Sequence, residues 1–186
     1  MPTDIVLIGP IGAGKSTIGE RLAAQLECPQ CSMDDYRWGY YKEIGYDEAI
    51  AKQKREAGGL WAVGQYWKPF EAYAVERLLS EHRHCVIDFG AGHSVYEEKA
   101  LFRRVARALS PYPNIVLLLP SADIEESIQI LNERNKDEPA DCMKVNEHFV
   151  RHPANSRLAK FVVYTKGKTP AETCQEILAL VKRDSL

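Results

Sequence analysis

The sequence predicts a three-layer α/β fold built on a five-stranded parallel sheet. Short runs of apolar residues recur along the chain, and longer stretches with helical periodicity separate them. The runs are nearly continuous in apolar residues, as in strands that are buried on both faces of a parallel sheet. Alternation of strands and helices then places helices on both faces of that sheet.

The expected elements follow one another in a regular order. The five strands are expected at residues 4–8, 30–33, 85–89, 115–119 and 161–164. Apolar residues at helical spacing follow the first strand, as in Ile18, Leu22 and Leu26, and similar stripes follow the third, fourth and fifth strands. The last helix should begin at residues 169–172, where a capping threonine, a first-turn proline and a returning glutamate agree.

Two segments interrupt this order. Residues 36–73 hold nine of the twelve Trp and Tyr residues, and residues 135–145 are polar and contain a proline. We expect a single domain over residues 1–186, with a substrate-binding insertion at 36–73 and a short lid at 135–145. The aromatic residues could instead form a small satellite core under a long loop.

Composition limits the partners. The 186 residues carry a formal net charge of −2, which offers no surplus of positive charge to neutralise a nucleic acid. No basic leader opens the chain, and no apolar run approaches the roughly 20 residues that span a bilayer. We therefore expect a cytoplasmic monomer or small homo-oligomer that binds neither membranes nor nucleic acid polymers.

A phosphate-binding loop follows the first strand and opens the first helix. The segment fits the pattern G-x-x-x-x-G-K-[ST] in full, in the strand–loop–helix context that confirms it. Its amide groups and the helix N-terminus suit phosphate oxygens, Lys15 can reach the β- and γ-phosphates, and the Ser16 hydroxyl can ligate Mg²⁺. We expect ATP to be bound by Gly9, Pro10, Ile11, Gly12, Ala13, Gly14, Lys15, Ser16 and Thr17.

Carboxylates are expected at the same edge of the sheet, where the carboxyl ends of parallel strands meet. Asp34 and Asp35 follow the second strand, and Asp88 ends the third. Asp88 is a candidate Mg²⁺ ligand, and Asp34 could orient an acceptor hydroxyl and take its proton. Either Asp34 or Asp35 could instead cap a helix or turn.

Other candidate groups surround this edge. Gly90, Ala91 and Gly92 would let a substrate approach the backbone, although they could equally form only a tight turn. Arg134 precedes the expected lid and is a candidate catalytic residue, although a lone arginine is by default a surface charge.

A cysteine pair offers an alternative chemistry. Cys28 and Cys31 have the C-x-x-C spacing of a redox pair or of half a zinc site. Packing is the favoured interpretation, because the pair follows a helix rather than opening one and no second Cys or His pair completes a zinc set.

Beyond the loop, the sequence resembles the shikimate kinase family, within the nucleoside monophosphate kinase-like P-loop kinases. Residues 5–19 read like the N-terminus of that family. Asp34 matches the second aspartate of its D-x-D motif, which implies contact with the acceptor hydroxyl. Residues 90–92 fall where the family has Gly-Gly-Gly, a backbone wall against the substrate. Arg151, in Arg-His-Pro, matches the arginine that grips the substrate carboxylate.

The sequence also departs from that family. Ser32 stands at the first aspartate of D-x-D, so Mg²⁺ support could pass to Asp88. Lys68 stands near a second substrate-gripping arginine and would lose its bidentate fork. Glu138 replaces an arginine of the lid, and residues 36–73 are longer and more aromatic.

Together these features predict an ATP-dependent kinase that uses Mg²⁺ and phosphorylates a hydroxyl or phosphate of a small anionic molecule. Lys15, Asp34 and Arg134 are the expected catalytic residues, and Arg151 with Lys68 should grip the acceptor. The aromatic insertion favours an acceptor with a larger or flatter ring than shikimate. A nucleoside or nucleotide kinase and a non-catalytic ATP-binding module are the alternatives.

Overall fold

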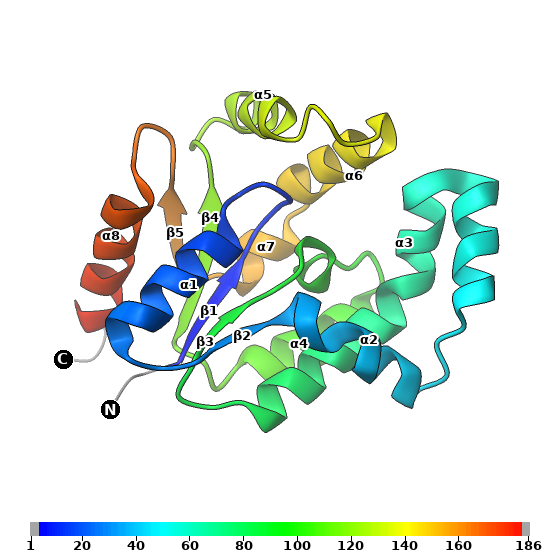
Figure 1. The fold of residues 1–186 in the computed structure, drawn as a ribbon, viewed down its shortest axis with the longest axis horizontal. Helices are drawn as coiled ribbons and strands as arrows, with labels where there is room; N and C mark the ends of the chain where they lie inside the picture. The colour runs from blue at the N-terminus through cyan, green and yellow to red at the C-terminus, as the bar shows by residue number, and fades with distance from the viewer. Residues whose placement is uncertain (1–3, 184–186) are drawn as a thin grey trace.

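A five-stranded parallel sheet forms the centre of the molecule, so the predicted fold class is confirmed. The computed structural model describes residues 4–183. The strands are β1 (Ile5–Ile8), β2 (Gln30–Ser32), β3 (Val86–Asp88), β4 (Asn114–Leu119) and β5 (Phe161–Tyr164). They lie in the order β2-β3-β1-β4-β5, with β1 between β3 and β4. The phosphate loop that follows β1 therefore lies at the middle of one sheet edge (Figure 1).

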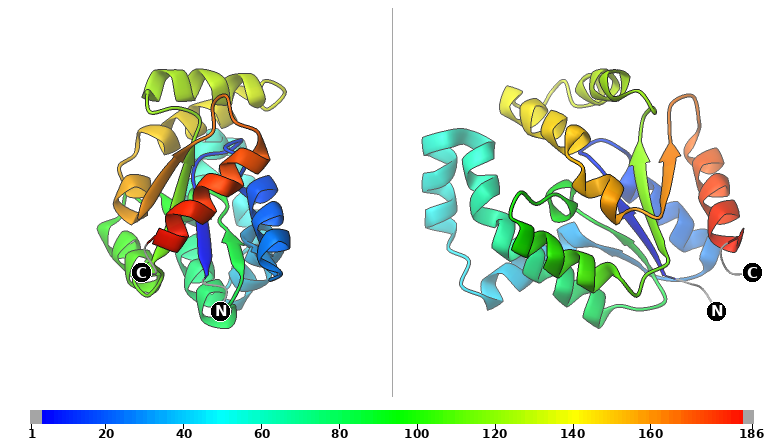
Figure 2. Two further views of the ribbon diagram at one scale, coloured as in Figure 1. Left: turned by 90° about the vertical axis from the view of Figure 1, so that its left-hand side faces the viewer. Right: turned by 180° about the vertical axis from the view of Figure 1, so that it is seen from behind.

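Helices cover both faces of the sheet and extend beyond it. They are α1 (Lys15–Leu26), α2 (Met33–Glu43), α3 (Glu48–Glu81), the 3₁₀ helix η1 (Ala91–Ser94), α4 (Lys99–Leu109), α5 (Ile124–Arg134), α6 (Ala140–Arg151), α7 (Ala154–Leu158) and α8 (Pro170–Arg183). Seen along the sheet, α1 and α8 lie on one side, and α4 and α7 lie on the other (Figure 2). The helices α5 and α6 and one end of α3 project past the edge that carries the phosphate loop (Figure 1).

The sheet divides the core into two hydrophobic clusters because successive residues of a strand point to opposite faces. Ile5 and Leu7 pack with the apolar side chains of α1 and α8. Val6 and Ile8 pack with those of α3 and α4. All four side chains are fully buried, which explains the unbroken apolar run from which this strand was predicted.

Local signals set several helix ends as expected. In α8, the Thr169 hydroxyl accepts a hydrogen bond from the Glu172 amide at 3.3 Å, and the Glu172 carboxylate accepts one from the Thr169 amide at 2.7 Å. This is the predicted capping box. Asp123 caps α5 by accepting from the Glu126 amide at 2.9 Å.

The long segment between β2 and β3 is helical almost throughout. It forms α2 and the first part of α3, and the 34-residue α3 is interrupted at Gly58 and Gly59. Gly59 has φ +66° and ψ −160°, a conformation that only glycine adopts readily. Next to this break, the Leu60 amide donates to the Asp141 carboxylate of α6 at 2.7 Å. Of the predicted lid, only 135–139 lies between helices, because residues 140–145 form the first half of α6.

Most aromatic side chains of this segment form a cluster with one another. Tyr41 is buried, and its ring lies 5.4 Å from that of Trp38 and 5.7 Å from those of Tyr46 and Phe70. This satellite core accounts for much of the aromatic content of residues 36–73 and holds α2 against α3. Trp67 of α3 joins this cluster through the Trp38 ring at 6.0 Å, whereas the Trp61 ring lies 4.9 Å from that of His148 of α6.

Across residues 4–183, no helix combines the length and the apolar character that crossing a membrane requires.

Candidate active site

The phosphate loop joins β1 to α1 with three glycines in the left-handed region. Gly9, Gly12 and Gly14 have φ of +142°, +77° and +92°. The chain turns back on itself there, and the Lys15 ammonium donates to the carbonyl oxygens of Gly9 at 2.9 Å and Pro10 at 2.8 Å. Burial lowers the pKa of Lys15 to about 8, although the carboxylates of Asp88 and Asp34 act in the opposite direction. The loop therefore holds a buried cation beside its amide groups.

Asp88 lies at the end of β3 with its carboxylate beside the loop. One oxygen accepts hydrogen bonds from the Ser16 hydroxyl at 2.8 Å and the Ser32 hydroxyl at 3.1 Å, and the other accepts from the Gln30 side chain at 2.9 Å. A hydroxyl and a carboxylate at this spacing are the oxygen donors that Mg²⁺ prefers. Ser16 and Asp88 thus fit a magnesium site, and Ser32 supports the carboxylate from the position where the related motif has an aspartate.

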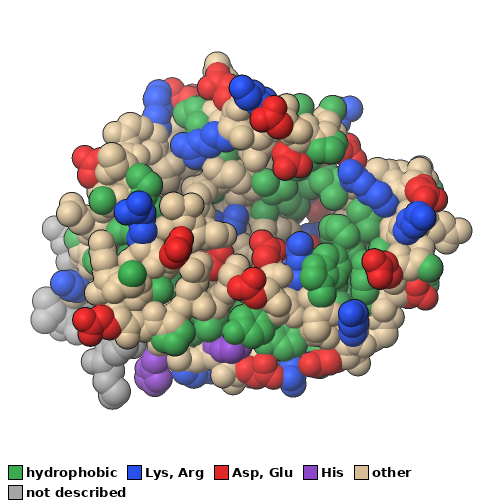
Figure 3. Space-filling model, viewed as in Figure 1, with side chains coloured by type: hydrophobic (Ala, Val, Ile, Leu, Met, Phe, Trp, Pro, Cys, Tyr) green, Lys and Arg blue, Asp and Glu red, His purple; other side chains and the backbone are tan. Residues whose placement is uncertain are grey.

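Two cavities meet at this edge of the sheet. The first, of about 290 Å³, is lined by the phosphate loop. The second, of about 220 Å³, lies between the loop and the insertion, and its wall includes two tryptophans of α3, Trp61 and Trp67. The surface is hollowed in this region, with hydrophobic side chains gathered at the side of α3 (Figure 3). We call the second cavity the acceptor cavity.

Asp34 lies in the first turn of α2 and lines both cavities, as do Gly90 and Ala91. Its carboxylate is exposed and lies 3.3 Å from the Arg37 guanidinium. The sequence therefore placed Asp34 correctly at the edge of the sheet, and the structure puts it at the junction between the two cavities. A carboxylate in that position can contact groups on both sides.

The glycines after β3 make room for polar side chains of the protein itself. A β-carbon on Gly90 would lie 2.7 Å from Nδ1 of His93 and 3.4 Å from an oxygen of Asp34. A β-carbon on Gly92 would lie 2.4 Å from a carboxylate oxygen of Glu71. Close approach is thus required at both positions, and the glycine wall brings Asp34, Glu71 and His93 to the same side of the acceptor cavity.

Lys68 lines the acceptor cavity with its charge already paired. The ammonium donates to Glu71 at 2.7 Å and to the Gly92 carbonyl at 2.9 Å, and it lies 5.3 Å from the Tyr96 ring and 5.5 Å from the Phe149 ring. The side chains of Lys68 and Glu71 are both buried. Breaking such a pair is strongly unfavourable, so Lys68 primarily holds the wall of the cavity together.

Arg151 lies at the end of α6 and does not line the acceptor cavity. Its guanidinium donates to Glu125 at 2.7 and 2.8 Å and to Glu147 at 2.9 Å. In this structure Arg151 joins α6 to α5, and its predicted contact with the acceptor stays a prediction.

The helices α5 and α6 contact the phosphate loop directly. Arg134, the last residue of α5, donates to the Gly12 carbonyl at 3.1 Å. Asn146 of α6 is buried, accepts from the Ile11 amide at 2.7 Å and donates to the Ile11 carbonyl at 3.0 Å. Asn135 fills the space beside Gly12, where a β-carbon would lie 2.5 Å from its amide nitrogen. The expected lid is therefore in contact with the loop.

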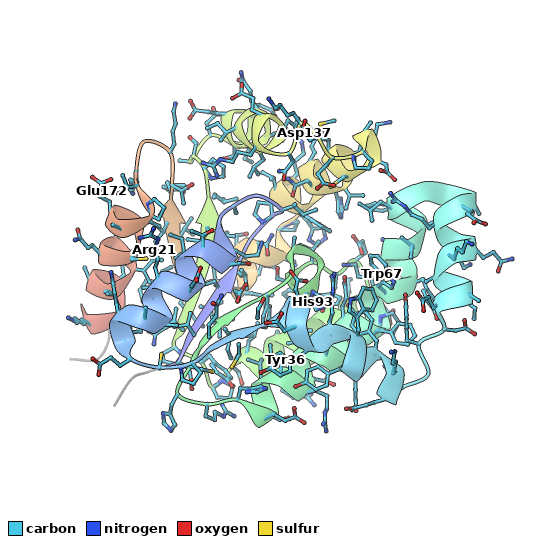
Figure 4. All side chains as sticks on the ribbon, in the orientation of Figure 1. Arg21, Tyr36, Trp67, His93, Asp137 and Glu172 are labelled. Atoms are coloured by element: carbon cyan, nitrogen blue, oxygen red, sulfur yellow. The ribbon has the colours of Figure 1, made fainter. Side chains whose placement is uncertain are left out.

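Sequence reasoning missed four residues around this site: Arg37, Glu71, His93 and Asn146. No motif marks them, and the hydrogen-bond partners of His93 and Asn146 lie in other elements. His93 is the clearest case, because burial lowers its pKa to about 4 and its Nε2 lies 3.1 Å from the Tyr41 hydroxyl. The available signal was its position directly after the glycine wall. Trp67 of α3 and His93 of η1, both labelled in Figure 4, line the acceptor cavity.

A second group of possible ligands borders the cavity. Ligand atoms of Glu97, His148 and His152 lie within 4.8 Å of one another. His148 is hydrogen-bonded to Glu97 at 2.7 Å, and Nδ1 of His152 accepts from the Ala154 amide at 3.1 Å. A metal-binding imidazole normally donates from its second nitrogen, so the tautomer of His152 does not suit a metal.

The cysteine pair shows no sign of redox activity. Cys28 and Cys31 are free thiols, and burial raises the pKa of both. A reactive cysteine needs a lowered pKa, so packing is the better interpretation.

Comparison with known proteins agrees with this geometry. The family model described as shikimate kinase matches residues 11–182. A curated shikimate kinase from Streptomyces coelicolor is 28% identical, with the match covering 96% of this chain and 95% of that protein.

Solved structures show the same fold. A shikimate kinase from Acinetobacter baumannii in complex with shikimate has a TM-score of 0.68 at 21% identity, covering 99% of this chain and 95% of its own. A gluconokinase from Sinorhizobium meliloti has a TM-score of 0.64 at 20% identity, covering 98% and 93%. At these identities the likeness shows a shared fold and does not identify an acceptor.

Proposed function

The chain belongs to the shikimate kinase family and is an ATP-dependent phosphotransferase, and we propose that it phosphorylates a hydroxyl group of a small ring-shaped acid. The position of Asp34 supports this most directly, because it lines both the phosphate-loop cavity and the acceptor cavity. A carboxylate between a nucleotide and an acceptor can orient the attacking hydroxyl and receive its proton.

The other residues would position the nucleotide. The amides of the phosphate loop and the Lys15 ammonium would hold the β- and γ-phosphates, and Arg134 would add positive charge from α5. Lys15 would exchange its carbonyl partners for phosphate oxygens. Magnesium, held by Ser16 and Asp88, would supply further neutralisation of phosphate charge. Asn146 would keep α6 on the loop and help to exclude water.

Cavity size supports a small acceptor. The acceptor cavity measures about 220 Å³, below the roughly 300–1,000 Å³ of pockets that hold drug-sized ligands. This favours a single small ring over a nucleotide. The exposed face of Trp61 and the half-buried Trp67 offer apolar walls for a flat ring. This agrees with the predicted preference for an acceptor whose ring is flatter than the ring of shikimate.

The related proteins carry shikimate in their names, and this chain differs from the family pattern at Ser32 and Lys68. Shikimate is therefore the first acceptor to test and not an assumed one. We also propose that the protein is a cytoplasmic monomer or small homo-oligomer and that it has no nucleic acid partners.

The test is a screen for ADP formation with MgATP and individual acceptors. The panel contains shikimate, other ring hydroxy acids, gluconate, nucleosides and nucleoside monophosphates, with products identified by mass spectrometry. We expect a ring hydroxy acid to give the highest kcat/KM, and Lys15→Ala to reduce turnover more than about tenfold while the fold survives. A nucleoside as best acceptor would support the nucleoside kinase alternative. Binding of MgATP without ADP formation in the presence of any acceptor would support the non-catalytic module.

A further inference from the structure

The side chain of Gln30 in β2 joins the first turn of α1 to the carboxylate at the end of β3. Its amide nitrogen donates to the Ser16 carbonyl oxygen at 3.2 Å and to Oδ1 of Asp88 at 2.9 Å. A carbonyl oxygen and an ionised carboxylate both accept, so the two hydrogens of one amide group can satisfy them together. Among residues 4–183, Gln30 is the one donor to this oxygen of Asp88.

The helix α1 leaves room for this side chain. A β-carbon on Gly19 would lie 2.9 Å from the Gln30 amide nitrogen and 3.5 Å from its amide carbon. Glycine is less favourable than alanine in a helix interior, and Gly19 is one of the buried residues of α1. The close approach of Gln30 therefore gives a physical reason for glycine at this position.

Ser16 is the residue whose hydroxyl Asp88 orients. Asp88 is only 2% exposed and does not line the phosphate-loop cavity, whereas Ser16 does. The Ser16 hydroxyl donates its single proton to Oδ2 of Asp88 at 2.8 Å. Its oxygen lone pairs are then left for a cation in the cavity. The direction in which they point depends on where the Asp88 carboxylate is held.

Hydrogen bonds hold that carboxylate at both of its oxygens. The hydroxyls of Ser16 and Ser32 donate to Oδ2, and Gln30 donates to Oδ1. A carboxylate bonded at both oxygens cannot rotate without breaking one of these bonds. Loss of the Gln30 amide would leave Oδ1 buried without a donor, which favours rotation of the carboxylate and a change in the direction of the Ser16 hydroxyl.

We propose that Gln30 is a positioning residue for magnesium binding, because it fixes Asp88 against the backbone of Ser16 and so orients the Ser16 hydroxyl toward the cation. The proposal rests on the proposed placement of magnesium at Ser16 and Asp88. Gln30 lines neither the phosphate-loop cavity nor the acceptor cavity, so it acts through those two residues. Groups that orient metal ligands in this way typically change metal affinity by about 10–100-fold when they are replaced.

The test measures how strongly magnesium tightens nucleotide binding, with no acceptor present. Isothermal titration calorimetry gives the Kd of the non-hydrolysable β,γ-imido analogue of ATP in excess Mg²⁺ and in excess EDTA, and we call the ratio of the two the magnesium effect. The variants are Gln30→Met, Gln30→Asn and Asp88→Asn. Gln25→Met is the matched control, because Gln25 is exposed on α1 and lines neither cavity.

We expect a magnesium effect of about tenfold or more in the wild type. Gln30→Met keeps the length of the side chain and removes its donors, so it should reduce the effect about tenfold while the Kd in EDTA changes less than about threefold. Gln30→Asn is one methylene shorter and cannot reach both acceptors, so it should reduce the effect as well. Asp88→Asn should reduce the magnesium effect at least as much, and Gln25→Met should leave it unchanged.

The proposal is overturned if Asp88→Asn loses the magnesium effect while Gln30→Met and Gln30→Asn keep it. Equal weakening of the analogue with and without magnesium would also overturn it, because that result means that Gln30 only packs β2 against α1. A magnesium effect that Asp88→Asn leaves intact would overturn the placement of magnesium, and the proposal with it. Circular dichroism establishes that each variant is folded, and Gln30→Asn decides if Gln30→Met is not. No acceptor enters the measurement, so a failed acceptor screen would leave its result standing.

Discussion

Lys15 illustrates how burial prepares a side chain for a ligand. It is 9% exposed, and the ammonium is held by two loop carbonyls, which are weaker partners than phosphates. Burial disfavours the charged form and lowers its pKa to about 8. The phosphates of ATP should raise that pKa again, so that nucleotide binding and protonation become linked.

We therefore predict that ATP binding takes up a proton at alkaline pH. At pH 8.5, wild-type protein should take up a substantial fraction of a proton per MgATP, and affinity should fall further as pH rises, because neutral Lys15 must first be protonated. Calorimetry in two buffers of different ionisation enthalpy measures this uptake. Lys15→Arg is the control, since a guanidinium does not titrate in this range. Equal uptake in both proteins would show that Lys15 is not the linked group.

His93 links the stability of the folded protein to pH in the acid range. Burial lowers its pKa from 6.5 to about 4, against the carboxylate of Glu71, while Arg37 and Lys68 lower it further. The unfolded chain then binds more protons than the folded one between pH 4 and 6.5, so the contribution is present above pH 6.5 and is lost as pH falls toward 4.

On this basis, wild-type protein should lose about 2 kcal/mol more unfolding free energy than His93→Gln between pH 7 and pH 5. Urea unfolding at the two pH values measures the difference, and other titrating groups cancel in the comparison. Equal losses would mean that His93 is not held neutral by the fold.

Single residues were predictable where a motif fixed their place. The loop residues and Asp88 belong to sequence patterns whose place at the end of a strand is fixed by the fold. Arg37 and His93 were not predictable, because their significance comes from neighbours in α3 and from the glycine wall. Gly90 and Gly92 were recognised as sites of close approach, but the structure shows protein side chains approaching them.

At the level of elements, the contact between α6 and the phosphate loop joins parts that are far apart in sequence. Asn146 satisfies both the amide and the carbonyl of Ile11. The Asp141 carboxylate, five residues earlier in α6, accepts from the Leu60 amide of α3 and from Arg55 at 2.7 Å each. The helix α6 therefore ties the loop and the insertion together.

The Asn146→Ala substitution tests what the contact between α6 and the phosphate loop contributes. The change removes the partner of the Ile11 amide and leaves the Ile11 carbonyl only the longer bond from Asn135 at 3.4 Å; an unsatisfied buried group costs about 1–3 kcal/mol. We expect a lower Tm and a KM for ATP raised about tenfold, measured by thermal unfolding and steady-state kinetics. Asn132→Ala is the matched control, because Asn132 of α5 is half-buried and lines neither the phosphate-loop cavity nor the acceptor cavity. An unchanged KM with a lowered Tm would leave Asn146 a structural role only.

The strands and α8 were predicted more accurately than the insertion, and the difference has a physical reason. The five strands agree with their apolar runs to within one or two residues, and α8 begins at its capping box. The insertion was expected as a cover, yet it forms two helices whose rings mostly pack on each other. Its shape depends on the break at Gly59 and on Asp141, which lies more than eighty residues away in the chain.

At the level of the whole molecule, the sheet brings two cavities together at the carboxyl ends of β1, β2 and β3. The strand order puts the phosphate loop beside Asp88 and the start of α2 (Figure 1), and residues of the insertion line the acceptor cavity. This arrangement leaves the Asp34 carboxylate between the two cavities, where a nucleotide and an acceptor would lie on either side of it. The fold class and the positions of the phosphate loop and Asp34 followed from sequence, and the acceptor cavity required the structure.

The direct test of this account is the effect of Asp34→Asn on two separate quantities. Single-turnover phosphoryl transfer to the best acceptor should slow by about 10²–10⁴-fold, the usual contribution of a general base. The Kd for MgATP, measured by calorimetry on the same protein, should change less than about threefold, because the carboxylate acts on the acceptor. An equal loss of ATP affinity and turnover would place Asp34 at the magnesium site, and an unchanged rate would remove it from the mechanism.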